Sequence, residues 1–268
     1  IVLACFGSVI EQQKYLDLES SIVEKFPDCD VFVSFSSRMV IKLLKKKKNE
    51  EYKNLPQTLA DIDMLGYKHV SVVSINIFPT DEHEVLKKIV DGFKHFSLAN
   101  ISCTNALLTK TKETTAFLKD LNEQISKDDT ANLYVIHGTP RLDTVGIDSI
   151  SYSASFLELI SENNFTCSLE GAFPYFEIND VIKSRIEKLG LKKVQVVPLL
   201  LVSGNHYIED MFEIKDDLSD KFESFIVPSL TKSEKFNLIE LPMIQNIIEK
   251  NIQNTFKMMG ISHKEITY

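Results

Sequence analysis

The sequence has no apolar run long enough to cross a membrane. Its longest, residues 194–202, is interrupted by Gln195 and Pro198 and reaches about half the length that a spanning helix needs. The chain begins on an apolar segment, residues 1–6, without an initiator Met and without the basic and cleavage regions of a signal peptide. We expect no membrane span and a cytoplasmic protein, with an exported form left open because the natural start is not visible.

Cysteine is scarce, and basic residues are outnumbered. The four cysteines contain no CxxC pair, which excludes the dense framework of a disulfide-stapled secreted domain. The 30 Lys and Arg against 38 Asp and Glu give a formal net charge of -8, whereas binding to nucleic acid requires a concentrated basic surface. We therefore expect no nucleic-acid partner and buried free thiols at Cys5, Cys29, Cys103 and Cys167.

Short segments rich in β-branched and aromatic residues alternate with longer amphipathic stretches along the chain. This pattern is typical of βαβ units and a parallel sheet, so the fold class is predicted to be α/β. Strands are expected at residues 1–6, 30–34, 70–77, 97–103, 133–136, 166–170, 194–201 and 222–226. The clearest helices are expected at residues 11–25, 59–65, 82–96, 111–125, 153–162, 178–189, 207–218 and 242–259.

An internal echo indicates two similar halves. Residues 65–73 read LGYKHVSVV and residues 189–197 read LGLKKVQVV, each a helix end, a glycine and a buried strand. The polar stretch 126–132 has the composition of an exposed connection. The expected division is therefore an N-terminal half over residues 1–127 and a C-terminal half over residues 128–268.

Metal-compatible side chains follow three predicted strands of the second half: His137, Glu170 and His206. Ligands gather at the carboxyl ends of the strands in open parallel sheets. Two imidazoles and a carboxylate form the ligand set of an open divalent-metal site, and the adjacent glycines let a flat ligand approach the backbone. Taken singly, His137 could bond a neighbouring carbonyl, Glu170 could face a helix dipole, and His206 could lie beside a helix N-cap.

Several blocks of the chain resemble the anaerobic, class II cobalt chelatases of cobalamin biosynthesis, which act on sirohydrochlorin. The most specific is VPLLLVSGNHYIEDM at residues 197–211. The others are CFGS at 5–8, FP at 26–27, SSRMVIK at 36–42, YVIHGT at 134–139, SLEGAFP at 168–174 and INDVI at 178–182. The resemblance therefore extends over most of the chain.

The resemblance implies a chelatase-like fold of two Rossmann-like parallel-sheet halves with a tetrapyrrole-binding cleft between them, and a final helix, 242–259, that packs back across the halves. By motif match the metal ligands are His137, Glu170 and His206. The two histidines would also accept the pyrrole protons. The metal is then a substrate, with Co²⁺ favoured and Ni²⁺ or Fe²⁺ able to fit. No organic cofactor is implied, and a homo-oligomer is possible.

The first half departs from the family pattern in the segment SINIFPT at residues 74–80. Asn76 stands where the family usually has a histidine, and Thr80 replaces the usual glycine. His83 is close enough in sequence to supply an imidazole to the substrate, or it is a first-turn helix residue between acidic neighbours. Arg38 could hold a propionate or form a structural ion pair. Substrate-binding residues are expected at Ser8, Arg38, His83, Gly138 and Gly204.

The function predicted from these observations is insertion of a divalent metal, foremost Co²⁺, into sirohydrochlorin. Within enzymes, the alternative is a related chelatase with another metal or ring, including a ferrochelatase or an enzyme that removes iron from haem. From a different class comes a carrier that binds a tetrapyrrole or a metal complex without chemistry. The plainest alternative is a two-domain α/β protein that binds some other small molecule.

Overall fold

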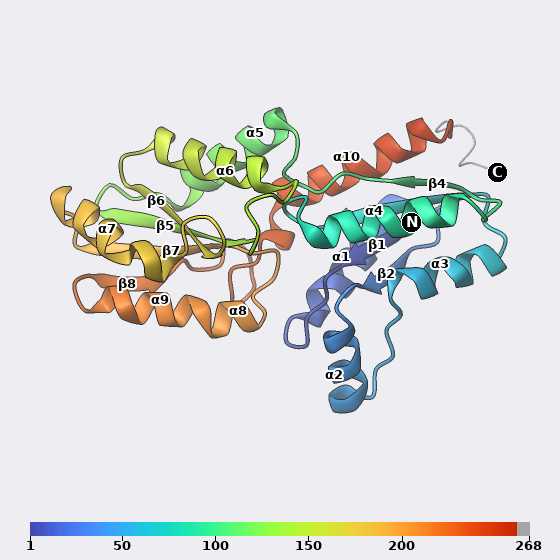
Figure 1. The fold of residues 1–268 in the computed structure, drawn as a ribbon, viewed down its shortest axis with the longest axis horizontal. Helices are drawn as coiled ribbons and strands as arrows, with labels where there is room; N and C mark the ends of the chain where they lie inside the picture. Colours follow the sequence, from blue (N-terminus) through green and yellow to red (C-terminus); the bar gives the residue numbers. More distant parts are fainter. Residues whose placement is uncertain (262–268) are drawn as a thin grey trace. The chain divides into compact units, whose positions relative to one another are not determined.

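The computed structural model describes residues 1–261, apart from the side chains of His206 and Tyr207. The chain divides into two compact units: unit 1 consists of residues 1–107 and the segment from Pro242 onward, and unit 2 of Leu108–Leu241. Each unit is built on a four-stranded, entirely parallel sheet with helices on both faces (Figure 1). The predicted α/β class is confirmed.

Unit 1 has the strand order β2-β1-β3-β4. One face carries α3 and α4, which cover apolar side chains of the sheet such as Val2, Val70 and Val72. The strands are β1 (Val2–Cys5), β2 (Phe32–Phe35), β3 (His69–Ile75) and β4 (Asn100–Cys103), and the helices are α1 (Gln12–Lys25), α2 (Arg38–Lys48), α3 (Leu55–Met64), α4 (Asp81–Lys94) and α10 (Pro242–Met258).

The last helix, α10, completes unit 1. It packs on β3 and β4, where the hydroxyls of Ser71 and Thr255 form a buried hydrogen bond. It also meets α1, because Phe256 packs edge-on against Phe26 and Glu249 pairs with Lys25. The face of the sheet away from α3 and α4 is therefore covered by α10 together with α1.

Unit 2 has the corresponding strand order β6-β5-β7-β8. Its main apolar cluster joins the sheet to α7 and α9, through side chains such as Ile182, Ile186, Ile214 and Leu218. The strands are β5 (Thr130–Gly138), β6 (Asn164–Glu170), β7 (Lys193–Leu199) and β8 (Glu223–Ile226), and the helices are α5 (Thr111–Ile125), α6 (Ile147–Ile160), α7 (Tyr175–Lys188), α8 (Asn205–Ile208), α9 (Asp210–Ser219) and the 3₁₀ turn Leu238–Glu240.

A buried amide ladder crosses the unit 2 sheet near the amino ends of its strands. Asn132 of β5 donates to Asn164 of β6 at 2.7 Å and accepts from Gln195 of β7. Gln195 also donates to the carbonyl of Ile125, and Asn164 to the side chain of Asn122, both on α5. The ladder ties three strands to α5 without leaving these amides unpaired, as buried polar groups require.

The division into units differs from the expected division at 127/128. The polar stretch at residues 126–132 is a short turn into β5: Thr130 and Asn132 are fully buried, and Asn132 belongs to the amide ladder. Helix α5 therefore belongs to unit 2, while α10 belongs to unit 1. None of the helices within residues 1–261 combines the length and the apolar character that a membrane crossing requires.

Candidate metal site

His137 lies in β5 itself, one residue before the strand ends. The structure extends this strand to Gly138, beyond the predicted end at residue 136. The side chain is partly buried, and Nδ1 lies 3.4 Å from the carbonyl oxygen of Gly138. Because β5 is an interior strand, flanked by β6 and β7, its carboxyl end holds the imidazole in the middle of the sheet edge.

Glu170 is the last residue of β6 and pairs with Gly138 in the strand register. Its side chain is exposed. A Cβ placed on Gly138 would lie 1.9 Å from the carbonyl oxygen of Glu170, and a Cβ on Gly171 would lie 1.8 Å from that of Thr139. Both glycines also have positive φ, 82° and 77°. Backbone packed this closely fixes the two strand ends, and hence the origins of the His137 and Glu170 side chains, relative to each other.

The turn after Glu170 folds back on β6. Ser168 donates its N–H to the carbonyl of Phe173 at 3.0 Å and its hydroxyl to the carbonyl of Ala172 at 2.6 Å. Phe173 has a φ of 63°, an unusual conformation for a bulky side chain. Pro174 then precedes the first turn of α7, so the turn is held at both ends.

The segment that leads to His206 is hydrogen-bonded to residues 236–239, which follow β8. Ser203 donates its N–H to the side chain of Asn237 at 2.7 Å, and its hydroxyl donates to the carbonyl of Phe236. The N–H of Ile239 bonds the carbonyl of Leu201 at 3.0 Å, and that of Gly204 bonds Val202 at 2.9 Å. His206 itself lies in the short helix α8; its side chain is outside the described part of the structure.

The three predicted ligands therefore lie at or after the carboxyl ends of three adjacent strands, in the order β6, β5, β7. The chain reverses direction across the sheet between β5 and β7, and this is where open α/β sheets bind ligands. Among the side chains that the structure describes, which do not include that of His206, no three of His, Cys, Asp and Glu are grouped to hold a metal ion. The structure brings together the strand ends that carry His137 and Glu170.

The substrate-binding residues predicted in unit 1 lie in different surroundings. Ser8 is buried, and its Oγ accepts the N–H groups of Ile10 at 3.3 Å and Glu11 at 3.0 Å, just before α1. Arg38 is the exposed first residue of α2. Ser8 thus supports a turn, whereas the Arg38 guanidinium is open to an anion from solvent.

His83 is buried in the first turn of α4, with 3% of its surface exposed. Its Nδ1 lies 2.8 Å from the hydroxyl of Ser74, and the side-chain amide of Asn76 donates to the same hydroxyl at 3.0 Å. Burial lowers the pKa of His83, and nearby Lys87 lowers it further. A neutral His83 is therefore linked through Ser74 to Asn76, the residue that departs from the family pattern.

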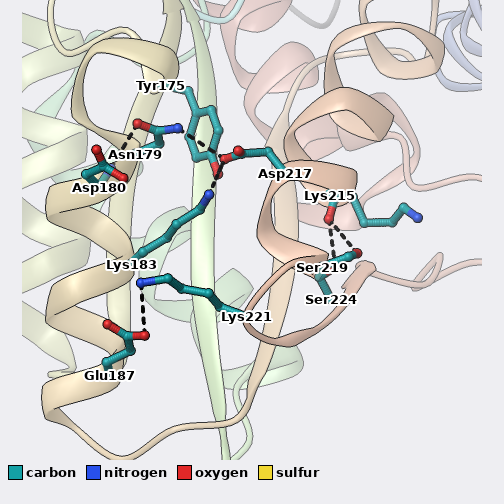
Figure 2. A network of polar contacts seen from close by, with 10 residues as sticks. All are labelled: Tyr175, Asn179, Asp180, Lys183, Glu187, Lys215, Asp217, Ser219, Lys221 and Ser224. Atoms are coloured by element: carbon teal, nitrogen blue, oxygen red, sulfur yellow. Dashed lines mark hydrogen bonds and ion pairs between the residues drawn. The ribbon is translucent and has the colours of Figure 1, made fainter.

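Sequence reasoning missed a cluster of polar side chains between α7 and α9 (Figure 2). One carboxylate oxygen of Asp217 accepts from Tyr175 Oη at 2.7 Å, Lys183 Nζ at 2.8 Å and Asn179 Nδ2 at 3.2 Å. The three donors recur every fourth residue of α7, a spacing that places them on one face of a helix. That spacing was visible in the sequence, but their shared partner on another helix was not.

Comparison with known proteins identifies the family. The family model described as cobalt chelatase (CbiK) matches residues 1–257. The chain belongs to the cobalt chelatase family. The resemblance found in the sequence is thereby confirmed. A curated relative, the sirohydrochlorin cobaltochelatase of Salmonella typhimurium, is 22% identical over 195 residues, which cover 72% of this chain and 71% of the relative.

Solved structures of two similar proteins support the fold of the family. SirB from Bacillus subtilis with Fe³⁺ has a TM-score of 0.68 at 14% identity, covering 97% of each chain. The sirohydrochlorin chelatase SirB from Bacillus subtilis subspecies spizizenii in complex with cobalt has a TM-score of 0.64 at 13% identity, covering 96% of this chain and 94% of its own. At these identities the likeness concerns the fold.

Proposed function

We propose that this chain inserts Co²⁺ into sirohydrochlorin, with His137, Glu170 and His206 as the ligands that deliver the metal. The observation that carries the proposal is the close backbone packing of the two strand ends that bear His137 and Glu170. It is supported by membership of the cobalt chelatase family and by the name of the Salmonella relative. The backbone of His206 follows the next strand of the same edge.

This ligand set suits the chemistry of metal insertion. Two neutral imidazoles and one carboxylate hold a divalent ion of intermediate softness and leave positions open for the ring nitrogens. Insertion releases two pyrrole protons, and an imidazole accepts protons near neutral pH. His137 and His206 would ligate the ion and accept the protons, while Glu170 ligates it and balances its charge.

Substrate contacts are proposed at the carboxyl edges of both sheets. Gly138 and Gly204 are proposed as backbone contacts of the flat ring. Gly204 has no side chain to hinder the ring, whereas the side-chain position of Gly138 is filled by the Glu170 carbonyl, so the ring would meet the Gly138 peptide from another side. Arg38 is exposed and suits a ring carboxylate, with Ser8 shaping the turn beside the first strand. Buried His83 would act through Ser74, by orienting the amide of Asn76 toward the ring.

Incubating the purified protein with sirohydrochlorin and Co²⁺, and following the change in ring absorption, tests the proposal. The parent should insert Co²⁺, whereas His137→Ala and Glu170→Gln should lose insertion by at least about a hundredfold, because direct ligands matter more than the outer groups that cost 10- to 100-fold. His69→Ala is the matched control: His69 is the exposed first residue of β3, at the opposite end of its strand.

Parallel incubations with Fe²⁺ and Ni²⁺, and with protoporphyrin in place of sirohydrochlorin, decide among the related chelatase activities. Faster turnover with another metal or ring would replace cobalt or sirohydrochlorin in the proposal. A parent that binds sirohydrochlorin tightly but inserts none of the three metals would instead be a carrier.

A further inference from the structure

The Asp217 cluster links the two helices that follow the ligand-bearing segments of unit 2. Tyr175 is the first residue of α7, which begins directly after the Glu170 turn. Asp217 lies on α9, which begins directly after α8, the helix that contains His206. The contact between Tyr175 and Asp217 therefore connects the residue that follows the Glu170 turn to the last turn of α9, the helix whose first turn follows the His206 segment.

The cluster is partly buried against apolar packing. The Lys183 side chain is 8% exposed and that of Asp217 is 26% exposed, beside Ile182, Ile214 and other members of the apolar cluster between α7, α9 and the sheet. An ion pair placed there loses hydration, and an apolar pair of similar size is often equally stable or more so. The apolar cluster is sufficient to hold α7 against α9. The ion pair between Lys183 and Asp217 is therefore expected to have a role other than stability.

That role is to define the register between the two helices. Apolar side chains tolerate small sliding movements, whereas three donors that converge on one carboxylate oxygen fix both distance and direction. Burial raises the pKa of Asp217, but the hydrogen bonds that it accepts, the largest contribution coming from Lys183, outweigh burial and hold that pKa below its usual value. The carboxylate therefore stays ionised at neutral pH.

Helix α9, which carries Asp217, is itself fixed to the sheet. The hydroxyls of Ser219 and Ser224 both donate to the carbonyl of Lys215, at 2.8 Å and 2.7 Å (Figure 2). Because Ser224 belongs to β8, these bonds join α9 to the sheet. The Asp217 carboxylate is thus presented to α7 from a helix that is anchored to the sheet.

We propose that Asp217 and Lys183 are positioning residues of the metal site: by fixing α7 on α9 they set the separation of Glu170 and the His206 segment, and so the affinity for Co²⁺. This inference rests on the proposed ligand set. Groups that orient metal ligands from outside typically change metal affinity by 10- to 100-fold when they are removed.

The chain offers a matched control on the same two helices. Lys221 and Glu187 form an ion pair at 3.0 Å with side chains 47% and 48% exposed. Glu187 lies in the last turn of α7, and Lys221 follows the end of α9. Figure 2 shows this pair beside the Asp217 cluster. It joins α7 to the end of α9 through the same chemistry, about one helical turn further from the ligand-bearing segments than Lys183 and Asp217.

The test compares Lys183→Met/Asp217→Leu with Glu187→Gln/Lys221→Met. Co²⁺ is titrated into each protein without tetrapyrrole, and the visible absorption of the bound ion reports affinity and coordination geometry. We expect the first variant to unfold within a few degrees of the parent, yet to bind Co²⁺ about tenfold more weakly or worse, with an altered spectrum and a raised KM for Co²⁺. The control should match the parent, and Asp217→Glu should recover part of the affinity.

Parent-like Co²⁺ affinity and spectrum in a folded Lys183→Met/Asp217→Leu variant would overturn the inference, as would equal losses in the control. If that variant does not fold, Asp217→Asn, which keeps the size of the side chain, is read by the same two criteria. The titration contains no tetrapyrrole. A parent that binds Co²⁺ without inserting it would therefore contradict the proposed reaction, but its titration would still test whether Asp217 and Lys183 position the metal site. A parent that binds no Co²⁺ overturns both.

Discussion

The sheets of unit 1 and unit 2 share one strand order but end differently at their carboxyl edges. In each unit an interior strand leads into a glycine of positive φ, Gly7 at 98° and Gly138 at 82°. The residue before each glycine is Phe6 in unit 1 and His137 in unit 2. The residue opposite each glycine on the neighbouring strand, when the register is continued, is Ser37 in unit 1 and Glu170 in unit 2. The same framework thus carries metal-compatible side chains in one copy only.

The helices that cover the two sheets correspond as well, although they come from different parts of the chain. In unit 2, α5 packs beside α6 and accepts a hydrogen bond from Gln195. In unit 1, α10 packs beside α1 and bonds Ser71, the residue equivalent to Gln195 in the internal echo. Helix α10 thus fills in unit 1 the place that α5 fills in unit 2, which explains why the units do not follow the order of the sequence.

The largest effect is expected from a side chain added to the packed strand ends of unit 2. Gly138→Ala places a Cβ 1.9 Å from backbone that cannot move aside, and we expect it to lower the free energy of unfolding by about 4 kcal/mol or more. Gly190→Ala is the control: it has a similar φ, 73°, with open space around the new methyl group, and should cost about 1 kcal/mol. Urea unfolding measures both; equal costs would show that the close packing is not needed.

The second-largest loss of stability is expected when Asn132, the central residue of the amide ladder, is replaced. Asn132→Ala takes one buried hydrogen bond from each of Gln195 and Asn164, which leaves a buried donor and a buried acceptor unsatisfied, at an expected cost of about 3 kcal/mol. Ser71→Ala in unit 1 removes one hydrogen bond to α10 and should cost about 1 kcal/mol. The same unfolding measurement compares them, and a larger loss for Ser71→Ala would reverse the expected ranking of the two units.

The double substitution His137→Phe/Glu170→Ser gives the edge of unit 2 the residues of unit 1. Cobalt insertion should fall by at least about a hundredfold, equivalent to about 2.7 kcal/mol in activation free energy, while stability changes by about 1 kcal/mol or less because Glu170 is exposed and His137 only partly buried. Initial rates and thermal unfolding are measured together. Retained insertion would mean that the metal enters through other residues.

The smallest expected effect is on the pH dependence of stability, to which His83 contributes in unit 1 and Asp217 in unit 2. The pKa of His83 is lowered in the folded protein, so the unfolded chain binds more protons and stability should fall as the pH drops below about 6.5. The pKa of Asp217 is also lowered, so its contribution should be lost only as the pH falls through about 4. Compared with the parent, thermal unfolding should show a smaller loss of stability below about pH 6.5 in His83→Gln and a smaller loss near about pH 4 in Asp217→Asn; unchanged profiles would contradict both assignments.

Much of the fold was readable from the sequence because parallel strands and their helices leave a local periodic signal. The echo at 65–73 and 189–197 corresponds to β3 and β7 with a left-handed glycine before each, Gly66 and Gly190. The sequence did not predict that α5 belongs to unit 2 and α10 to unit 1, because the pattern of an amphipathic helix shows which face is buried but not which sheet it packs on. The polar stretch at 126–132 was expected to be an exposed connection because buried Thr130 and Asn132 are residue types that are also common in exposed turns.

The candidate site was readable to a similar degree. Strand-end positions and family blocks pointed to His137 and Glu170, and the structure places both at one sheet edge. The glycine next to each was visible in the sequence. The packing of Gly138 on the Glu170 carbonyl and of Gly171 on the Thr139 carbonyl was not, because it joins residues far apart in the chain. The Asp217 cluster was missed for the same reason, since its donors and its acceptor lie on helices separated by a strand.

Helix α10 has a consequence for the order in which the protein is made. The whole of unit 2 is encoded between the two segments of unit 1, and domains generally fold as units during synthesis, the earlier ones first. Here the first sheet to be synthesised lacks α10, one of the helices on its second face, until Pro242–Met258 has been made, after the whole of unit 2. Unit 2 is therefore the first of the two units to have all its strands and helices, although the synthesis of unit 1 begins earlier.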